Sequence, residues 1–177
     1  MIVVTGFGPF LDVDDNPSGQ LARGCHGLRV QGETLVGRVI DASYVGGIQE
    51  TIRIAQGLSP RLVLGTGLSR RASASRLERF AYSDYSTTLL DVDDQVGRPP
   101  AGPERVESTV NLERLAASLE VELSTEPGRY VCNAWLYEVS RALKGVPVGF
   151  LHIPSEGFEV GRLLKGLQTY LDGGASV

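Results

Sequence analysis

The sequence has few cysteines and histidines and no long hydrophobic run, and each scarcity excludes a class of protein. Two cysteines do not make the disulfide framework of a small secreted protein, which indicates a reducing, cytoplasmic location. A Cys25–Cys132 disulfide is the alternative that the composition leaves open. No apolar run reaches the roughly 18 residues of a membrane span. The first apolar run has no basic residues before it, so a signal peptide is not expected.

Positive charge is also in short supply. Lysine and arginine together number 17, against 21 aspartates and glutamates, and the net charge of -4 argues against nucleic acid as the main partner. Hydrophobic residues make up 42% of the chain, enough for the core of an ordinary globular protein. We therefore expect a single domain over residues 1–177, with neither nucleic acid nor membrane as a partner.

Short apolar runs alternate with amphipathic stretches along the chain. The apolar runs predict strands at Ile2–Thr5, Thr34–Ile40, Arg61–Thr66, Tyr130–Val131 and Val146–Ile153. The amphipathic stretches predict helices at Pro17–Cys25, Tyr44–Gln56, Glu104–Leu119, Asn133–Lys144 and Phe158–Leu171. This alternation predicts an α/β fold, a three-layer αβα sandwich around a mostly parallel, twisted sheet.

The stretch Tyr82–Pro103 breaks the alternation, since it is rich in Asp, Ser, Gly and Pro. It predicts a long loop, with a hairpin as an alternative. The string "LDVDD" occurs here and again near the N-terminus, but neither copy continues into a calcium-binding loop. These acids are interpreted as solvated loop residues, and no metal or cofactor is predicted.

Cys132 lies where the short apolar run ends and a helical pattern begins. At a helix N-terminus, free backbone N–H groups and the helix dipole favour a thiolate and can stabilise an oxyanion. His152 lies near the end of the next predicted strand, and two neighbouring parallel strands would place both residues at one sheet edge. Such a pair is the minimum for nucleophilic acyl transfer. Position alone leaves open that both residues are structural, and Cys25, beside His26, is expected to be structural.

Three segments together resemble the type I pyroglutamyl peptidases, a family of cysteine exopeptidases. The first, "VTGFGPFLDVDDNPS", is similar to the family's N-terminal signature. The second, "GLSRRASASRLERFA", is similar to its Gly-rich segment that ends in Glu-Arg-x-Ala. The third comprises "YVCNAWLYEV" and "GFLHIP", which are similar to its cysteine and histidine elements. The segments follow in the family's order, from residue 1 to about 155.

The resemblance implies a catalytic triad of Cys132 as nucleophile, His152 as base and then acid, and Glu78 as the carboxylate that orients the imidazole. The implied substrates are peptides with an N-terminal pyroglutamyl residue, a five-membered lactam without a free amine. Phe7 and Phe10 match the phenylalanines that contact this ring in the family. The resemblance also implies assembly into dimers or tetramers and no cofactor.

Asn16 matches a polar residue of the family's pocket, and Arg71 is expected to assist at the scissile carbonyl. Three positions depart from the family pattern, and one of them is Ser83, where the family commonly has an asparagine. Leu11 occupies the place of a glycine and is expected to reshape the pocket mouth. Ala72 occupies the place of an arginine, with Arg71 one position early. These departures motivate two alternatives, a binding protein that has lost efficient turnover and a thiol amidase or acyltransferase for another small amide.

Overall fold

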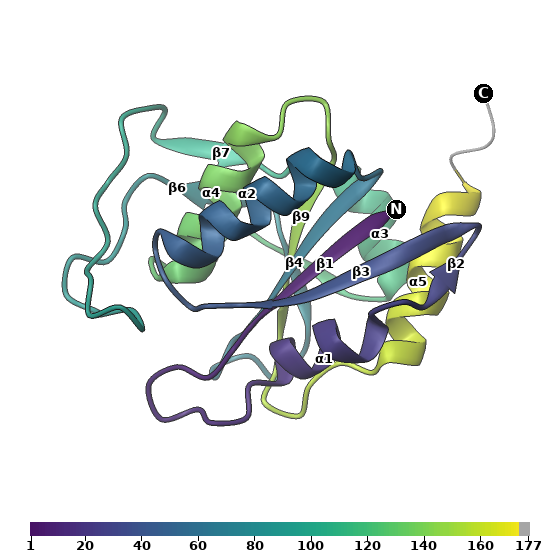
Figure 1. Cartoon of the computed structure of the whole chain (residues 1–177), viewed down its shortest axis with the longest axis horizontal. Helices are drawn as coiled ribbons and strands as arrows, with labels where there is room; N and C mark the ends of the chain where they lie inside the picture. Colours follow the sequence, from purple (N-terminus) through teal and green to yellow (C-terminus); the bar gives the residue numbers. More distant parts are fainter. Residues whose placement is uncertain (174–177) are drawn as a thin grey trace.

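A seven-stranded sheet forms the centre of the molecule (Figure 1). The computed structural model describes residues 1–173. The strands run in the order β2-β3-β1-β4-β9-β5-β8, in which only the pairs β2·β3 and β9·β5 are antiparallel. Their bounds are β1 Ile2–Phe7, β2 Arg29–Val30, β3 Glu33–Ile40, β4 Leu62–Leu68, β5 Arg76–Glu78, β8 Glu122–Ser124 and β9 Val148–Ile153.

Helices cover both faces of this sheet, which confirms the predicted three-layer α/β fold (Figure 1). One face carries α1 (Pro17–Cys25), α3 (Leu112–Leu119) and α5 (Val160–Asp172). The other carries α2 (Gly46–Leu58) and α4 (Val131–Ala142). No helix among residues 1–173 is long and apolar enough to cross a membrane.

The strands supply both cores because their side chains alternate between the two faces. In β1, Ile2 and Val4 pack on the side of α1, α3 and α5, while Val3 and Phe7 pack on the side of α2 and α4. A strand buried on both faces has no polar face, which is why the parallel strands are almost continuously apolar in sequence.

The long loop connects the two strands of a small separate sheet. β6 (Phe80–Tyr82) pairs antiparallel with β7 (Arg105–Glu107), and residues 83–104 between them carry no helix or strand. The predicted loop over Tyr82–Pro103 is thus confirmed except for Tyr82, which is the last residue of β6, and the strands that flank the loop form the hairpin.

One predicted helix is wrong in part, and one predicted strand is wrong altogether. The helix expected over Glu104–Leu119 begins only at Leu112, because the Asn111 side chain caps it by accepting from the Arg114 N–H. The residues before the cap include β7, whose valine fits a strand as well as a helix. The strand expected at Tyr130–Val131 is absent, since Tyr130 is the N-cap of α4 and Val131 is its first residue.

Candidate active site

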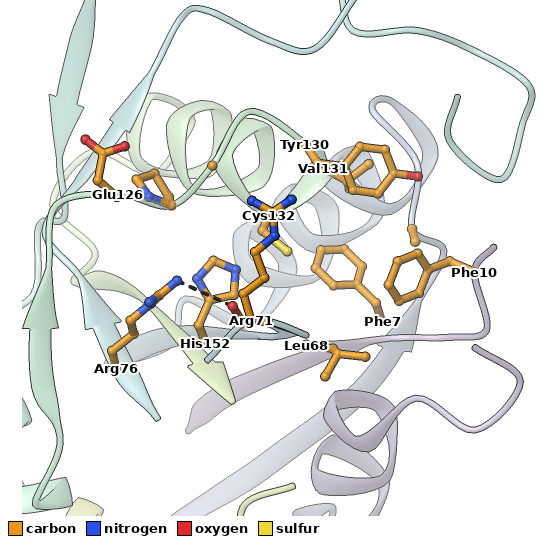
Figure 2. A pocket seen from close by; sticks show the side chains of 14 residues that line it. Phe7, Phe10, Leu68, Arg71, Arg76, Glu126, Tyr130, Val131, Cys132 and His152 are labelled. Atoms are coloured by element: carbon orange, nitrogen blue, oxygen red, sulfur yellow. Dashed lines mark hydrogen bonds between the residues drawn. The ribbon is translucent and has the colours of Figure 1, made fainter. Parts of the chain in front are cut away.

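A cavity of about 340 Å³ opens beside the carboxyl ends of β1, β4 and β9 (Figure 2). This edge is where open α/β sheets place their sites. Five of the seven residues predicted to form the site line the cavity, namely Phe7, Phe10, Arg71, Cys132 and His152. Figure 2 shows aromatic side chains at one end, charged side chains at the other, and Cys132 and His152 between them.

Cys132 is the second residue of α4, and several contacts fix this helix. The Asn133 side-chain amide accepts from the Tyr82 N–H at 2.7 Å and donates to the Tyr82 carbonyl at 2.8 Å. The indole N–H of Trp135 donates to Thr51 Oγ1 at 3.0 Å. No side chain caps α4, so the N–H groups of its first turn lack partners within the helix. Cys132 therefore lies on a rigid helix start with backbone donors around it.

The route by which Cys132 reaches the site differs from the prediction. The strand before α4 is β8, which ends at Ser124, and β5 lies between β8 and β9 in the sheet. Cys132 is thus not at the end of a strand next to that of His152. The helix start brings the sulfur to the sheet edge instead.

Glycine in β4 makes room for the sulfur. A Cβ atom at Gly67 would lie 2.8 Å from Cys132 Sγ, so the thiol packs directly against the backbone of β4. Gly67 is in turn the register partner of His152 on β9. The sulfur of Cys132 and the residue His152 therefore both lie beside Gly67.

His152 and Glu78 form a buried pair. His152 Nδ1 lies 2.7 Å from Glu78 Oε1, and the exposed fractions of the two residues are 4% and 0%. His152 shares a strand face with Val148 and Phe150, which pack on the side of α4. Since Glu78 accepts only when Nδ1 carries the proton, this contact leaves Nε2 free to act as a base.

Burial, and to a smaller extent the negative charge of Glu78, raises the pKa of the Cys132 thiol to about 12. Both effects oppose the thiolate that this helix start was expected to favour. A neutral thiol is a weak nucleophile, so attack by the sulfur needs a base that takes its proton.

Cys25 lies far from this chemistry. It is the last residue of α1 and is wholly buried in the core on that side of the sheet, and its thiol donates to the Ala22 carbonyl at 3.3 Å. Both cysteines are free, so the alternative of a Cys25–Cys132 disulfide is wrong. The expected structural role of Cys25 agrees with this position.

Aromatic rings form one end of the cavity. Phe7 is buried, and Phe10 lies with its ring centroid 6.3 Å from that of Tyr130. Asn16 does not line the cavity. Its side chain accepts from the N–H and hydroxyl of Ser18 and donates to the Gly8 carbonyl, so it caps α1 and fixes the chain beside Phe7.

Arg71 lines the cavity although it is one position early in the family pattern. The Ala72 N–H donates to the Ser69 carbonyl at 3.1 Å, which closes a tight turn after β4. This turn carries the Arg71 side chain to the site, and the residue at position 72 does not line the cavity.

Leu11 does not reshape the cavity, contrary to expectation. It is 68% exposed, does not line the cavity and has a φ of 50°, in the left-handed region that favours glycine. The glycine of the family pattern is thus explained by the backbone at this position.

Replacing Leu11 by glycine is expected to stabilise the protein by up to about 1 kcal/mol, because the strain relieved exceeds the entropy that glycine adds to the unfolded chain. The melting temperature should rise by about 2–4 °C, while kcat/KM stays within about twofold. Leu89→Gly is the control, since Leu89 is also exposed but has no positive φ, and its melting temperature should fall. Equal shifts in both variants would contradict the backbone explanation.

Nine of the 14 residues that line the cavity were not found from the sequence, and Arg76, Glu126 and Tyr130 are among them. A signal existed for Arg76, because it precedes Glu78 by two residues and would share its face in a strand. Tyr130 precedes Cys132 by two residues. Glu126 carries no signal that distinguishes it from a surface acid.

A thiol, an imidazole and a buried carboxylate at the sheet edge of an α/β fold are the groups of a cysteine hydrolase. Comparison with known proteins defines the class further. The pyroglutamyl peptidase family matches over residues 1–158. The chain belongs to this family.

Curated relatives and solved structures agree with this assignment. The chain is 27% identical to the pyrrolidone-carboxylate peptidase of Mycobacterium marinum, covering 86% of this chain and 76% of that protein. It is 26% identical to the pyrrolidone-carboxylate peptidase of Oceanobacillus iheyensis, covering 87% of this chain and 83% of that protein. A mutant pyrrolidone carboxyl peptidase of Pyrococcus furiosus superimposes with a TM-score of 0.84 at 21% identity, covering 97% of this chain and 96% of that one. The pyrrolidone carboxyl peptidase of Thermococcus litoralis superimposes with a TM-score of 0.84 at 20% identity, covering 97% of this chain and 91% of that one. At these identities the structures show the shared fold.

Proposed function

We propose that the protein is a cysteine exopeptidase that hydrolyses the bond after an N-terminal pyroglutamyl residue. Membership of the pyroglutamyl peptidase family supports the reaction. The observation that carries the assignment of residues is the contact of 2.7 Å between His152 and the buried Glu78, in a cavity that Cys132 also lines.

The geometry supports a two-step acyl transfer. His152 Nε2 takes the proton of the Cys132 thiol as the sulfur attacks the carbonyl carbon of the pyroglutamyl residue. Backbone N–H groups at the start of α4 stabilise the oxyanion. When the tetrahedral intermediate collapses, the imidazolium gives its proton to the leaving amine, and a thioester remains on Cys132.

Water completes the reaction. His152 takes a proton from a water molecule that attacks the thioester, and the second intermediate expels the sulfur, which regains the proton. Free pyroglutamate and the resting thiol result. Glu78 stabilises the imidazolium in both steps, so its charge matters most when the imidazole is protonated.

The aromatic end of the cavity suits the lactam ring. Phe7 and Phe10 offer apolar ring faces, which match a flat five-membered ring. Arg71 is the residue that we assign to the carbonyl oxygens of the substrate. We assign Asn16 an indirect role, because its amide is bonded to Ser18 and to the Gly8 carbonyl behind Phe7.

We further propose a cytoplasmic location and assembly into dimers or tetramers. The location is supported by two cysteines that are both free. The assembly rests on the family resemblance, and light scattering of the purified protein measures it directly.

A panel of fluorogenic amides tests the proposed function. The wild-type protein, kept reduced, should release the fluorophore from a pyroglutamyl amide. Release from prolyl and alanyl amides should be at least about 100-fold slower, because proline lacks the lactam carbonyl and alanine lacks the ring. Release should persist with a chelator present and stop after alkylation of the thiol.

Two other outcomes would overturn the proposal. A rise in melting temperature with 2-pyrrolidone, without cleavage of any amide, would indicate a binding protein. Cleavage of other small amides but not of the pyroglutamyl amide would indicate a thiol amidase.

A further inference from the structure

We propose that Arg76 is a positioning residue of the active site, which holds the Glu78 carboxylate against His152 and lowers the pH above which the imidazole can act as a base. The proposal rests on the function proposed above. Arg76 is not among the residues that the family resemblance implies.

The strand geometry places Arg76 beside both partners. Arg76 and Glu78 are two residues apart on β5 and share one face, while Leu77 between them packs into the opposite core. Arg76 is also the register partner of His152 across the antiparallel pair β5·β9. The three side chains therefore project together toward the side of α4.

Their contacts converge on one oxygen atom. Arg76 Nε donates to Glu78 Oε1 at 3.3 Å, and the same oxygen lies 2.7 Å from His152 Nδ1. A second guanidinium nitrogen donates to the Ser69 hydroxyl at 3.4 Å, the dashed line in Figure 2. Arg76 is thus tied to the turn after β4 as well as to the carboxylate, which limits its rotation.

The carboxylate needs this support because it is wholly buried. Glu78 is 0% exposed, and within residues 1–173 its Oε2 atom has no hydrogen-bond partner. An ionised carboxylate in such a place is unfavourable unless a cation lies beside it. An imidazole must be neutral to act as a base, so at that stage of the proposed reaction Arg76 is the cation that supports the anion.

The same charge acts on the imidazole. A cation near a histidine disfavours the protonated ring, whereas a carboxylate favours it. The charged and titratable groups of the cavity around His152 come from β5, from α4 with its N-cap, and from two loops. They are Glu78, Arg76, Cys132, Tyr130, Arg71 and Glu126. Removing Arg76 removes a cation that repels the protonated imidazole, while the attraction between Glu78 and that imidazole remains. The imidazole should therefore keep its proton to a higher pH.

The pH profile of kcat/KM tests this proposal. In Arg76→Met the acid limb should move up by roughly one pH unit, so that kcat/KM below the wild-type limb falls about tenfold. Arg76→Lys keeps the charge and should restore most of the shift. Arg79→Met is the matched control, because Arg79 lies on the other side of Glu78 in sequence and bonds to Glu107 and Glu113 on the surface. Its acid limb should not move.

A titration that needs no activity separates this proposal from the proposed function. The chain has only two histidines, so the imidazole signals in an NMR spectrum can be assigned with a His26→Gln variant. The pKa of His152 should rise in Arg76→Met and return toward the wild-type value in Arg76→Lys, whether or not a pyroglutamyl amide is cleaved. If Arg76→Met does not fold, Arg76→Gln provides the neutral side chain.

Two results would overturn the proposal. The first is a His152 pKa and an acid limb that are the same in the wild type and in the neutral variant. The second is a neutral variant whose shift lysine does not reverse at all, since that would show that the shape of the arginine side chain matters and its charge does not.

Discussion

Replacing Cys132 by alanine is expected to abolish hydrolysis of a pyroglutamyl amide, with a loss of at least about 10⁴-fold in kcat/KM. The proposed reaction stores the acyl group on this sulfur, and the described residues place no second thiol in the cavity. What remains in the variant is binding and the oxyanion donors of α4, which cannot form a thioester. Release of the fluorophore over hours, with product identified by mass, measures the loss.

Cys25→Ala is the matched control, because it also replaces a cysteine by alanine but does so at the end of α1, away from the cavity. Cys25 is wholly buried, burial raises the pKa of its thiol to about 11, and it lies among the core residues on the opposite face of the sheet. This variant should keep kcat/KM within about twofold and lose roughly 1 kcal/mol of stability to the cavity it leaves. Activity retained in Cys132→Ala, or lost in a folded Cys25→Ala, would refute the assignment of the nucleophile.

The long elements of the fold could be predicted because their sequences carry a period. Strands such as β1 and β9 are apolar on both faces, and α2 and α5 repeat apolar residues at helical spacing. Five strands were not predicted, and each has only two or three residues. A segment so short shows no period, and its pairing depends on contacts with distant parts of the chain.

Because short strands could not be predicted, the position of Glu78 in the site could not be predicted either. Its strand, β5, is one of the unpredicted ones, and the acid is flanked in sequence by arginines that favour a surface ion pair. Only its place between β9 and β8 buries it against His152. Glu78 was identified through the resemblance to a known family, whereas spacing and composition did not point to it.

Cys132 shows the opposite case, in which the position was predicted and its electrostatics were not. The start of a helix was placed within two residues of its observed position, and the donors of the first turn follow from it. The state of the thiol depends on burial and on a charge 54 positions away in the chain. Neither can be read from the sequence around the cysteine.

Glu78→Gln is expected to separate these effects, because it should lower catalysis while it makes the thiol more acidic. Without the carboxylate the imidazolium loses its stabilising charge and the tautomer is no longer fixed, so kcat/KM should fall by about 10²–10⁴-fold. The negative charge of Glu78 raises the pKa of Cys132. Its removal should therefore lower that pKa and increase the rate of alkylation by iodoacetamide at pH 8.

Opposite changes in the two rates distinguish a lost triad member from a damaged fold. A disordered site would expose both cysteines to alkylation, which the number of labels per chain reveals by mass. Glu107→Gln removes a solvent-exposed acid that contacts Arg79, and it should change neither rate. If Glu78→Gln were as active as the wild type, the pair of Glu78 and His152 would be structural. If alkylation slowed as catalysis fell, the Glu78 charge would be sustaining the thiolate through a protonated His152, and the resting state would be an ion pair.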